Sequence, residues 1–289
     1  LEMGARRAHG LTLSINGAKA AYIGGIAATS NVLADQFYGV PSGGTMAHSW
    51  VQMFDTEYEA FKTYAEIYPK DSTFLVDTYD TLKSGVPNAI KVIKDVLIPK
   101  GIKNMSIRID SGDLTYLSKQ ARQMLDDAGL KQCSITVSNS LDERLIKDLI
   151  IQGAPIDIFG VGERLITAKS DPVFGSVYKL VAVEEEDVIV PKIKVSENIE
   201  KITTPHFKTV YRITNMHGRF EADLITLFDE VVDDSRPLTI FDPISTWKEK
   251  TYNEYQLIKM HQPIYQSGKR VYDKPSLKEI RAYAKTQLE

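Results

Sequence analysis

The segment NMSIRIDSGD, residues 104–113, starts as a short apolar strand and ends in charged and hydroxyl side chains. Apolar residues then recur at helical spacing, at Leu114, Leu117, Ala121, Met124, Leu125 and Ala128. Gly129 follows as a stop signal. A buried strand followed by an amphipathic helix is the βα unit from which parallel sheets are built. The segment therefore predicts one unit of an α/β fold.

The same pattern recurs from residue 20 to about residue 183. Strand-like runs end at Thr29–Asn31, His48, Asp77–Asp80, Arg108–Asp113, Ser138–Ser140 and Gly160–Gly162. From His48 onward these ends lie about 22 to 33 residues apart, which suits a strand plus its crossover helix. A closed α/β barrel and an open doubly wound sheet both fit this spacing.

Helix signals lie between these runs. Thr56 with Glu59 forms a capping box, and Pro87 suits a first helical turn. Gly153 suits the end of the helix that precedes the last strand-like run.

The pattern changes after residue 184. Two strands are expected on either side of a turn at Met216–Gly218, with further strand-like runs behind them. Ser276 with Glu279 caps a last helix. We therefore predict two domains, an α/β catalytic domain at residues 1–183 and a mixed, strand-rich C-terminal region at residues 184–289.

Net charge, apolar runs and cysteine count argue against several classes of partner and location. The 289 residues carry a net charge of −3, which argues against nucleic acid as the main partner. No apolar run approaches the roughly 20 residues that span a bilayer, so no membrane partner is expected. The single cysteine, Cys133, rules out an internal disulfide and fits the reducing cytoplasm. Because the chain opens with Leu1 rather than Met, we expect it to begin inside a longer protein.

Polar side chains gather where the strand-like runs end. They are Thr29, Ser30, Asn31, Thr45, His48, Arg108, Asp110, Ser111, Asp113, Ser138 and Asn139. The carboxyl ends of parallel strands meet at one edge of a sheet, where α/β proteins place their active sites. We expect the functional site at this edge.

The RIDSGD stretch offers a guanidinium, a hydroxyl and two carboxylates. Arg108 and Asp110 have the same parity, so both can face one side of the sheet. Arginine suits bidentate capture of a carboxylate or phosphate, and Asp110 and Asp113 suit ribose hydroxyls or magnesium held through water. The alternative is a structural ion pair between Arg108 and Asp110, with Asp113 as a helix cap.

Two turns are candidate anion cradles. Gly160 and Gly162 follow a strand, and glycines let backbone N–H groups approach an anion closely; the alternative is a tight turn. Ser138 and Asn139 offer donors at the start of the next helix; the alternative is an N-cap.

His48 is the histidine that ends a predicted strand beside glycines and hydroxyls. A neutral imidazole is a competent nucleophile toward phosphoryl groups, although a structural histidine fits too, and no metal-ligand spacing includes His48. Near the start of the chain, Arg6 and Arg7 form a basic pair that suits either a diphosphate clamp or a solvated surface.

Taken in order, several motifs resemble nicotinate phosphoribosyltransferase. They are EMGARRAHG, ATSNVLA, GTMAHSW, RIDSGDL, VSNSLDE, FGVGERL and VYKLVAVE, from Glu2 to about Glu184, with a looser resemblance to the end. The family's N-terminal segment, which carries an aromatic residue that stacks on nicotinate, is not in this chain, which resembles the C-terminal two-thirds of the enzyme. The resemblance implies an irregular α/β barrel of the type II phosphoribosyltransferase kind, with a second, mostly β region.

The resemblance also implies a reaction. Phosphoribosyl passes from 5-phosphoribosyl 1-diphosphate to nicotinate, which gives nicotinate mononucleotide and diphosphate in NAD salvage. ATP hydrolysis is coupled through a phosphohistidine. Family membership implies ATP and Mg²⁺ as cofactors, a homodimer, and a cytoplasmic location; whether this chain is active without the N-terminal segment is left open.

Residue roles follow from the matching positions. His48 matches the phosphohistidine, and Thr45 and Arg108 match nicotinate contacts. Asp110 suits stabilisation of the cationic transition state. The positions expected to bind phosphoribosyl diphosphate are Arg6, Ser111, Asp113, Ser138, Asn139, Gly160 and Gly162.

One position departs from the family. Many relatives have threonine after the GVG turn, whereas this chain has Glu163, whose carboxylate repels phosphate. We therefore exclude Glu163 from the phosphate contacts and assign anion binding there to the backbone N–H groups of Gly160–Gly162.

Two alternatives remain at this stage. The first is nicotinamide phosphoribosyltransferase, in which proline typically follows both the arginine and the last aspartate of the RxDSGD stretch; Ile109 and Leu114 stand there instead. The second is a non-catalytic, phosphate-binding fragment.

Overall fold

The computed structural model describes residues 1–195 and 202–288, and their contacts form two compact units. The first unit is Leu1–Phe174 with Pro275–Glu289, and the second is Gly175–Lys274. This division differs from the expected boundary at 183/184, most of all for the last helix. That helix, α9 (Leu277–Leu288), packs on the first unit because Arg281 donates hydrogen bonds to the carbonyls of Tyr22 and Gly25.

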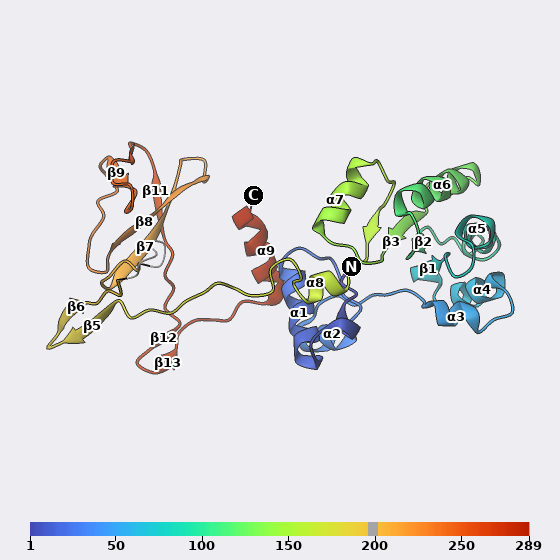
Figure 1. Cartoon of the computed structure of the whole chain (residues 1–289), viewed down its shortest axis with the longest axis horizontal. Helices are drawn as coiled ribbons and strands as arrows, with labels where there is room; N and C mark the ends of the chain where they lie inside the picture. The colour runs from blue at the N-terminus through green and yellow to red at the C-terminus, as the bar shows by residue number, and fades with distance from the viewer. Residues whose placement is uncertain (196–201, 289) are drawn as a thin grey trace. The chain divides into compact units, whose positions relative to one another are not determined.

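A four-stranded parallel sheet forms the centre of the first unit (Figure 1). Its strands are β1 (Ser72–Leu75), β2 (Met105–Ile109), β3 (Ser134–Val137) and β4 (Ile158–Phe159), in that order. Phe74, Ile107 and Ile135 lie side by side in the register and are fully buried. Continuous apolar strands of this kind are buried on both faces, as the sequence pattern predicts.

Helices lie before, between and after the strands, and most of them contribute buried residues to the core. They are α1 (Leu11–Ile23), α2 (Val32–Tyr38), α3 (His48–Gln52), α4 (Glu57–Ile67), α5 (Val86–Val92), α6 (Leu114–Asp127), α7 (Glu143–Ile151) and α8 (Glu163–Ile166). Shorter turns are η1 (Ala5–Arg7), η2 (Pro69–Asp71) and the π-helical η3 (Thr81–Gly85) and η4 (Ile93–Leu97).

The predicted helix signals are confirmed. The Thr56 hydroxyl accepts the N–H of Glu59 at 3.2 Å, and Pro87 lies in the first turn of α5. Gly129 and Gly153 follow α6 and α7 with φ of +79° and +68°, a region in which glycine is unstrained.

Two expected strands are wrong in part. The run that was expected to lead to Thr29 is helical up to Ile23, because α1 extends through alanines and leucines of high helix propensity. Thr29 itself makes single-residue parallel bridges to Glu2 and Ser42. The segment before His48 forms no strand, and His48 opens α3 rather than ending a strand.

These bridges continue the sheet into an irregular barrel. Beyond β4, Val161 pairs with Glu2, Glu2 with Thr29, and Thr29 with Ser42, all in parallel. The Thr45 hydroxyl then reaches Arg108 on β2, which brings the chain back to the first strands. The expected α/β barrel is therefore confirmed, with laddered strands on one side and single bridges on the other.

The residue before Asp77 is held from two sides. Val76 donates its N–H to the carbonyl of Arg108 at 3.0 Å. On the other side, Gly85 of η3 packs so closely that a Cβ there would collide with the Val76 carbonyl. The end of β1 is therefore fixed against both β2 and the π-helical turn.

Cys133 lies buried just before β3. Burial raises the pKa of its thiol to about 12, so the group stays protonated at neutral pH. An unreactive core role fits this cysteine.

The second unit is built from antiparallel strands. They are β5 (Ala182–Glu185), β6 (Val188–Pro191), β7 (Lys208–Thr214), β8 (Phe220–Leu227), β9 (Leu238–Phe241), β10 (Glu249–Tyr252), β11 (Gln256–Lys259), β12 (Tyr265–Gln266) and β13 (Lys269–Arg270). The largest sheet has the order β11-β7-β8, and the predicted turn between β7 and β8 is confirmed. Among the helices of residues 1–195 and 202–288, none has the length and apolar character needed to cross a bilayer.

Candidate active site

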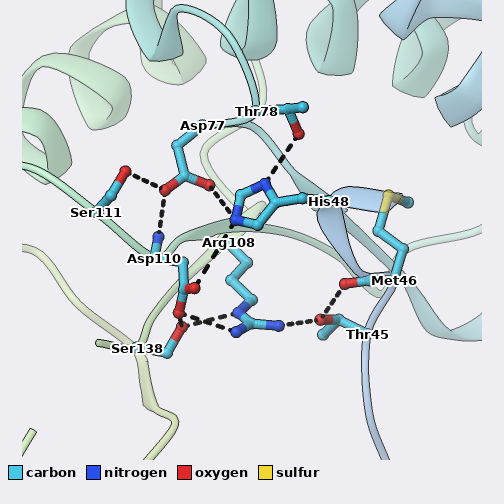
Figure 2. A network of polar contacts seen from close by, with 9 residues as sticks. All are labelled: Thr45, Met46, His48, Asp77, Thr78, Arg108, Asp110, Ser111 and Ser138. Carbon is cyan, nitrogen blue, oxygen red and sulfur yellow. Dashed lines mark hydrogen bonds and ion pairs between the residues drawn. The ribbon is translucent and has the colours of Figure 1, made fainter. Parts of the chain in front are cut away.

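Arg108 lies at the centre of a polar network at the carboxyl edge of the barrel (Figure 2). Its Nε donates to the Ser138 hydroxyl at 2.8 Å, and Nη1 donates to the Thr45 hydroxyl at 2.8 Å. Its Nη2 donates to Asp110 Oδ1 at 2.9 Å. Three partners from three different segments therefore fix the guanidinium in one orientation.

Asp110 lies between this guanidinium and the imidazole of His48. Its Oδ1 accepts hydrogen bonds from Arg108 and from the Ser138 hydroxyl. Its Oδ2 lies 3.8 Å from His48 Nε2. The carboxylate thus connects the expected carboxylate-binding group to the expected phosphoacceptor.

Asp77 is a functional candidate that sequence reasoning left out of the site. Its side chain is 1% exposed, and its Oδ2 accepts the N–H of Asp110 at 2.9 Å and the Ser111 hydroxyl at 2.6 Å. Its Oδ1 is buried without a hydrogen-bond partner in the described residues and lies 3.9 Å from His48 Nε2. The missed signal was its position directly after the apolar run of β1, the same position that selected Arg108 and Asp110.

His48 presents its two ring nitrogens to different surroundings. Nδ1 lies 3.1 Å from the Thr78 hydroxyl, whereas Nε2 faces the carboxylates of Asp77 and Asp110. Figure 2 shows the ring between these groups. Because its side chain is 40% exposed, the imidazole is accessible to a substrate from solvent.

Six predicted site residues come together in this network. They are Thr45, His48, Arg108, Asp110, Ser111 and Ser138. Asn139 is exposed, has φ of +97°, and makes no side-chain hydrogen bond to the part of the chain that the structure describes. Arg6 is exposed on η1.

The glycine turn adjoins the network, but two of its N–H groups are already used. Gly160 donates to the carbonyl of Val137 at 2.8 Å, and Val161 donates to that of Leu1 at 2.9 Å. A Cβ on Gly160 would lie 2.6 Å from the sulfur of Met3 and 3.2 Å from Cβ of Ser138, so a larger residue would require these side chains to shift. Of the three N–H groups expected to cradle an anion, this leaves the one of Gly162.

Asp113 caps α6, because its Oδ1 accepts the N–H of Tyr116 at 3.0 Å. Asp113→Ala is expected to lower the free energy of unfolding by about 1 kcal/mol, the usual value of an N-cap, as measured by urea denaturation. Asp113→Asn keeps the cap and should match the wild type. Equal destabilisation by both variants would show that the charge, and not the cap, matters.

Two overlapping parts of the chain match models of one protein family. Residues 1–223 match the nicotinate phosphoribosyltransferase (NAPRTase) family, and residues 207–289 match the nicotinate phosphoribosyltransferase C-terminal domain. Together these matches cover both compact units.

Individual relatives agree with this match. Nicotinate phosphoribosyltransferase of Bacillus subtilis (strain 168) is 48% identical over 289 residues, which cover 100% of this chain and 58% of the relative. The Homo sapiens protein of the same name is 30% identical, with 100% of this chain and 62% of the relative covered. The chain therefore spans less than two thirds of these relatives.

Solved structures show the same fold. The crystal structure of human nicotinic acid phosphoribosyltransferase has a TM-score of 0.76 at 26% identity, covering 99% of this chain and 63% of that one. Nicotinate-nucleotide pyrophosphorylase from Pyrococcus furiosus has a TM-score of 0.66 at 23% identity, covering 99% and 64%. With a family match over residues 1–223 and these likenesses, the chain belongs to the nicotinate phosphoribosyltransferase family.

Proposed function

We propose that this chain carries the phosphoribosyl-transfer site of a nicotinate phosphoribosyltransferase. The reaction joins nicotinate to 5-phosphoribosyl 1-diphosphate, gives nicotinate mononucleotide and diphosphate, and is coupled to ATP hydrolysis through phosphorylated His48. The observation that carries the proposal is that Asp110 contacts Arg108 through one oxygen and faces His48 through the other.

Arg108 is the proposed partner of the nicotinate carboxylate. A guanidinium has five N–H donors, and three of those on Arg108 are used by Thr45, Ser138 and Asp110. One donor therefore remains on each terminal nitrogen for a carboxylate. A fixed cation favours anionic nicotinate over neutral nicotinamide.

Asp110 is the proposed electrostatic stabiliser of the transfer step. The nicotinate ring nitrogen forms a bond to ribose C1, while the bond from C1 to the diphosphate oxygen breaks and diphosphate leaves with the electron pair. Positive charge develops on the ribose in this transition state. A carboxylate held by Arg108 and Ser138 is already oriented to stabilise that charge.

The two acids also suit Mg²⁺, which binds one or two carboxylates together with water and substrate phosphates. Asp77 Oδ1 is buried without a partner in the described residues, and it faces the same ring nitrogen as Asp110 Oδ2. These two oxygens are the groups that would hold the ion, which would neutralise charge on the phosphates when bound.

His48 is the proposed phosphoacceptor, and its surroundings select one nitrogen. The carboxylates beside Nε2 favour the tautomer with the proton there, which leaves the lone pair on Nδ1. Nδ1 then forms a bond to the terminal phosphorus of ATP as the bond from that phosphorus to ADP breaks. Thr78 lies beside this nitrogen and would meet the incoming phosphoryl group.

The test is incubation of the whole protein with γ-labelled ATP, followed by mapping of the acid-labile phosphate. We expect label on Nδ1 of His48, no label in His48→Ala, and full label in His217→Gln, which changes an exposed histidine of the second unit. Formation of nicotinate mononucleotide is measured in parallel. Label on another histidine, or none in the wild type, would contradict the assignment.

A further inference from the structure

We propose that Glu163 is an internal competitor for the anionic substrate, because it occupies Arg7 at the rim where diphosphate is expected to bind. This inference rests on the proposed function and adds a regulator of affinity to it. It assigns a role to a residue that the sequence analysis excludes from the phosphate contacts.

The pair joins two segments that are packed tightly together. Arg7 ends η1 and donates from Nη1 to Oε2 of Glu163, the first residue of α8. A Cβ on Gly4 would lie 2.6 Å from both the Gly162 carbonyl oxygen and Ile166 Cβ. Because the backbones cannot move apart without losing this packing, the two charged side chains are held within reach of each other.

The turn that precedes Glu163 adjoins the proposed active site. A Cβ on Gly160 would lie 3.2 Å from Cβ of Ser138, whose hydroxyl accepts a hydrogen bond from Arg108. Glu163 follows Gly160 by three positions along the same turn. An anion held near this turn is therefore exposed to the charges of both Arg7 and Glu163.

Three arginines lie on the two packed segments, Arg6 and Arg7 on η1 and Arg164 on α8, and they differ in whether they are already paired. Arg164 pairs with Asp142, which also caps α7; the N–H of Leu145 and this arginine lower the pKa of Asp142, so the pair stays charged. Arg6 has no ion pair within residues 1–195 and 202–288. Arg7 is intermediate in availability, because it is paired with Glu163 but the pair is exposed to water.

The carboxylate of Glu163 has no partner other than Arg7 in the described part of the chain. Unlike Asp142, it does not cap a helix. Its bond to Arg7 can therefore be given up without loss of other structure.

Both side chains of the pair are exposed to solvent, so diphosphate can replace Glu163 as the partner of Arg7. The side chains of Arg7 and Glu163 are 56% and 38% exposed, and ion pairs in contact with water are weak. Diphosphate carries several negative charges and binds arginine through charge-assisted hydrogen bonds, so it can replace a single carboxylate. Each binding event must then displace Glu163, and the affinity is lower than Arg7 alone would give.

The test is calorimetric titration of the 289-residue chain with inorganic diphosphate at fixed ionic strength. Glu163→Gln is expected to lower the Kd roughly two- to fivefold, the range of an exposed ion pair. The matched control is Glu66→Gln, which removes the same charge from an exposed pair with Lys62 and should leave the Kd unchanged. In the double variant Arg7→Gln with Glu163→Gln, the gain should disappear.

An unchanged Kd in Glu163→Gln overturns the inference, and so does a gain that survives in the double variant. The proposed function is judged separately by formation of nicotinate mononucleotide. If that product forms but Glu163→Gln binds diphosphate like the wild type, the inference alone fails. If the affinity shift is found but no product forms in the whole protein, the proposed function fails and the competition stands.

Discussion

Arg108→Lys is expected to lower kcat/KM for nicotinate by at least about a hundredfold in the whole protein. A lysine carries the same charge but cannot donate to Thr45, Ser138 and Asp110 in three fixed directions while it also binds a carboxylate. Asp110 would lose one of the two hydrogen bonds to Oδ1 and keep the one from Ser138. Steady-state kinetics with nicotinate as the varied substrate measure the effect.

Arg122→Lys is the matched control for this variant. Arg122 also makes three hydrogen bonds, to Asp126 and to the carbonyls of Leu130 and Cys133. These lie before β3, at the amino end of the strands, so the control should reduce stability without reducing kcat/KM. Equal kinetic effects of both substitutions would show that Arg108 acts on stability alone.

Gly85→Ala is expected to destabilise the first unit by about 3 kcal/mol, at the upper end of the cost of overpacking. The added methyl group would collide with the Val76 carbonyl, a backbone atom that cannot rotate away. Val76 in turn donates to the carbonyl of Arg108, so any shift also reaches the active site. Urea denaturation followed by circular dichroism measures the loss of stability.

Gly24→Ala provides the comparison for that substitution. Gly24 has φ of −70°, and its added Cβ would meet the Ala20 carbonyl oxygen at an ordinary 3.5 Å. This variant should unfold at the wild-type urea concentration. If Gly85→Ala did the same, the close contact with Val76 would be refuted.

The laddered half of the barrel was predictable because its signals are local. Apolar β-branched runs, capping residues and stop glycines specify β1 to β4 and α4 to α7 without reference to the rest of the chain. The half that contains Thr29 and His48 was not, because single-residue bridges leave no periodic pattern in the sequence. The run before Thr29 is apolar, and an apolar run suits a buried helix as well as a buried strand. Its pattern alone therefore does not distinguish the two.

The position of the site was predictable from the sequence, but the set of residues predicted for it was incomplete. Strand ends selected Arg108, Asp110 and Ser138 correctly as neighbours. Asp77 meets the same criterion, but its importance lies in an oxygen that is buried without a hydrogen-bond partner in the described residues and in its distance to His48. Both are facts of three-dimensional packing that spacing along the chain does not encode. The ion pair between Glu163 and Arg7 is likewise not encoded by spacing along the chain, because the two residues are 156 positions apart.

The unequal construction of the barrel makes one wall stiff and the other compliant. β1 pairs with β2, and β2 with β3, over four residues at each junction, whereas Glu2 pairs with Thr29, and Thr29 with Ser42, over one residue held by two backbone hydrogen bonds. We expect any deformation during ligand entry at the junction of Thr29 and Ser42 on this wall, where local opening costs least. Arg108, the proposed partner of the nicotinate carboxylate, stands on the rigid wall, and its position is preserved while the mouth of the barrel yields.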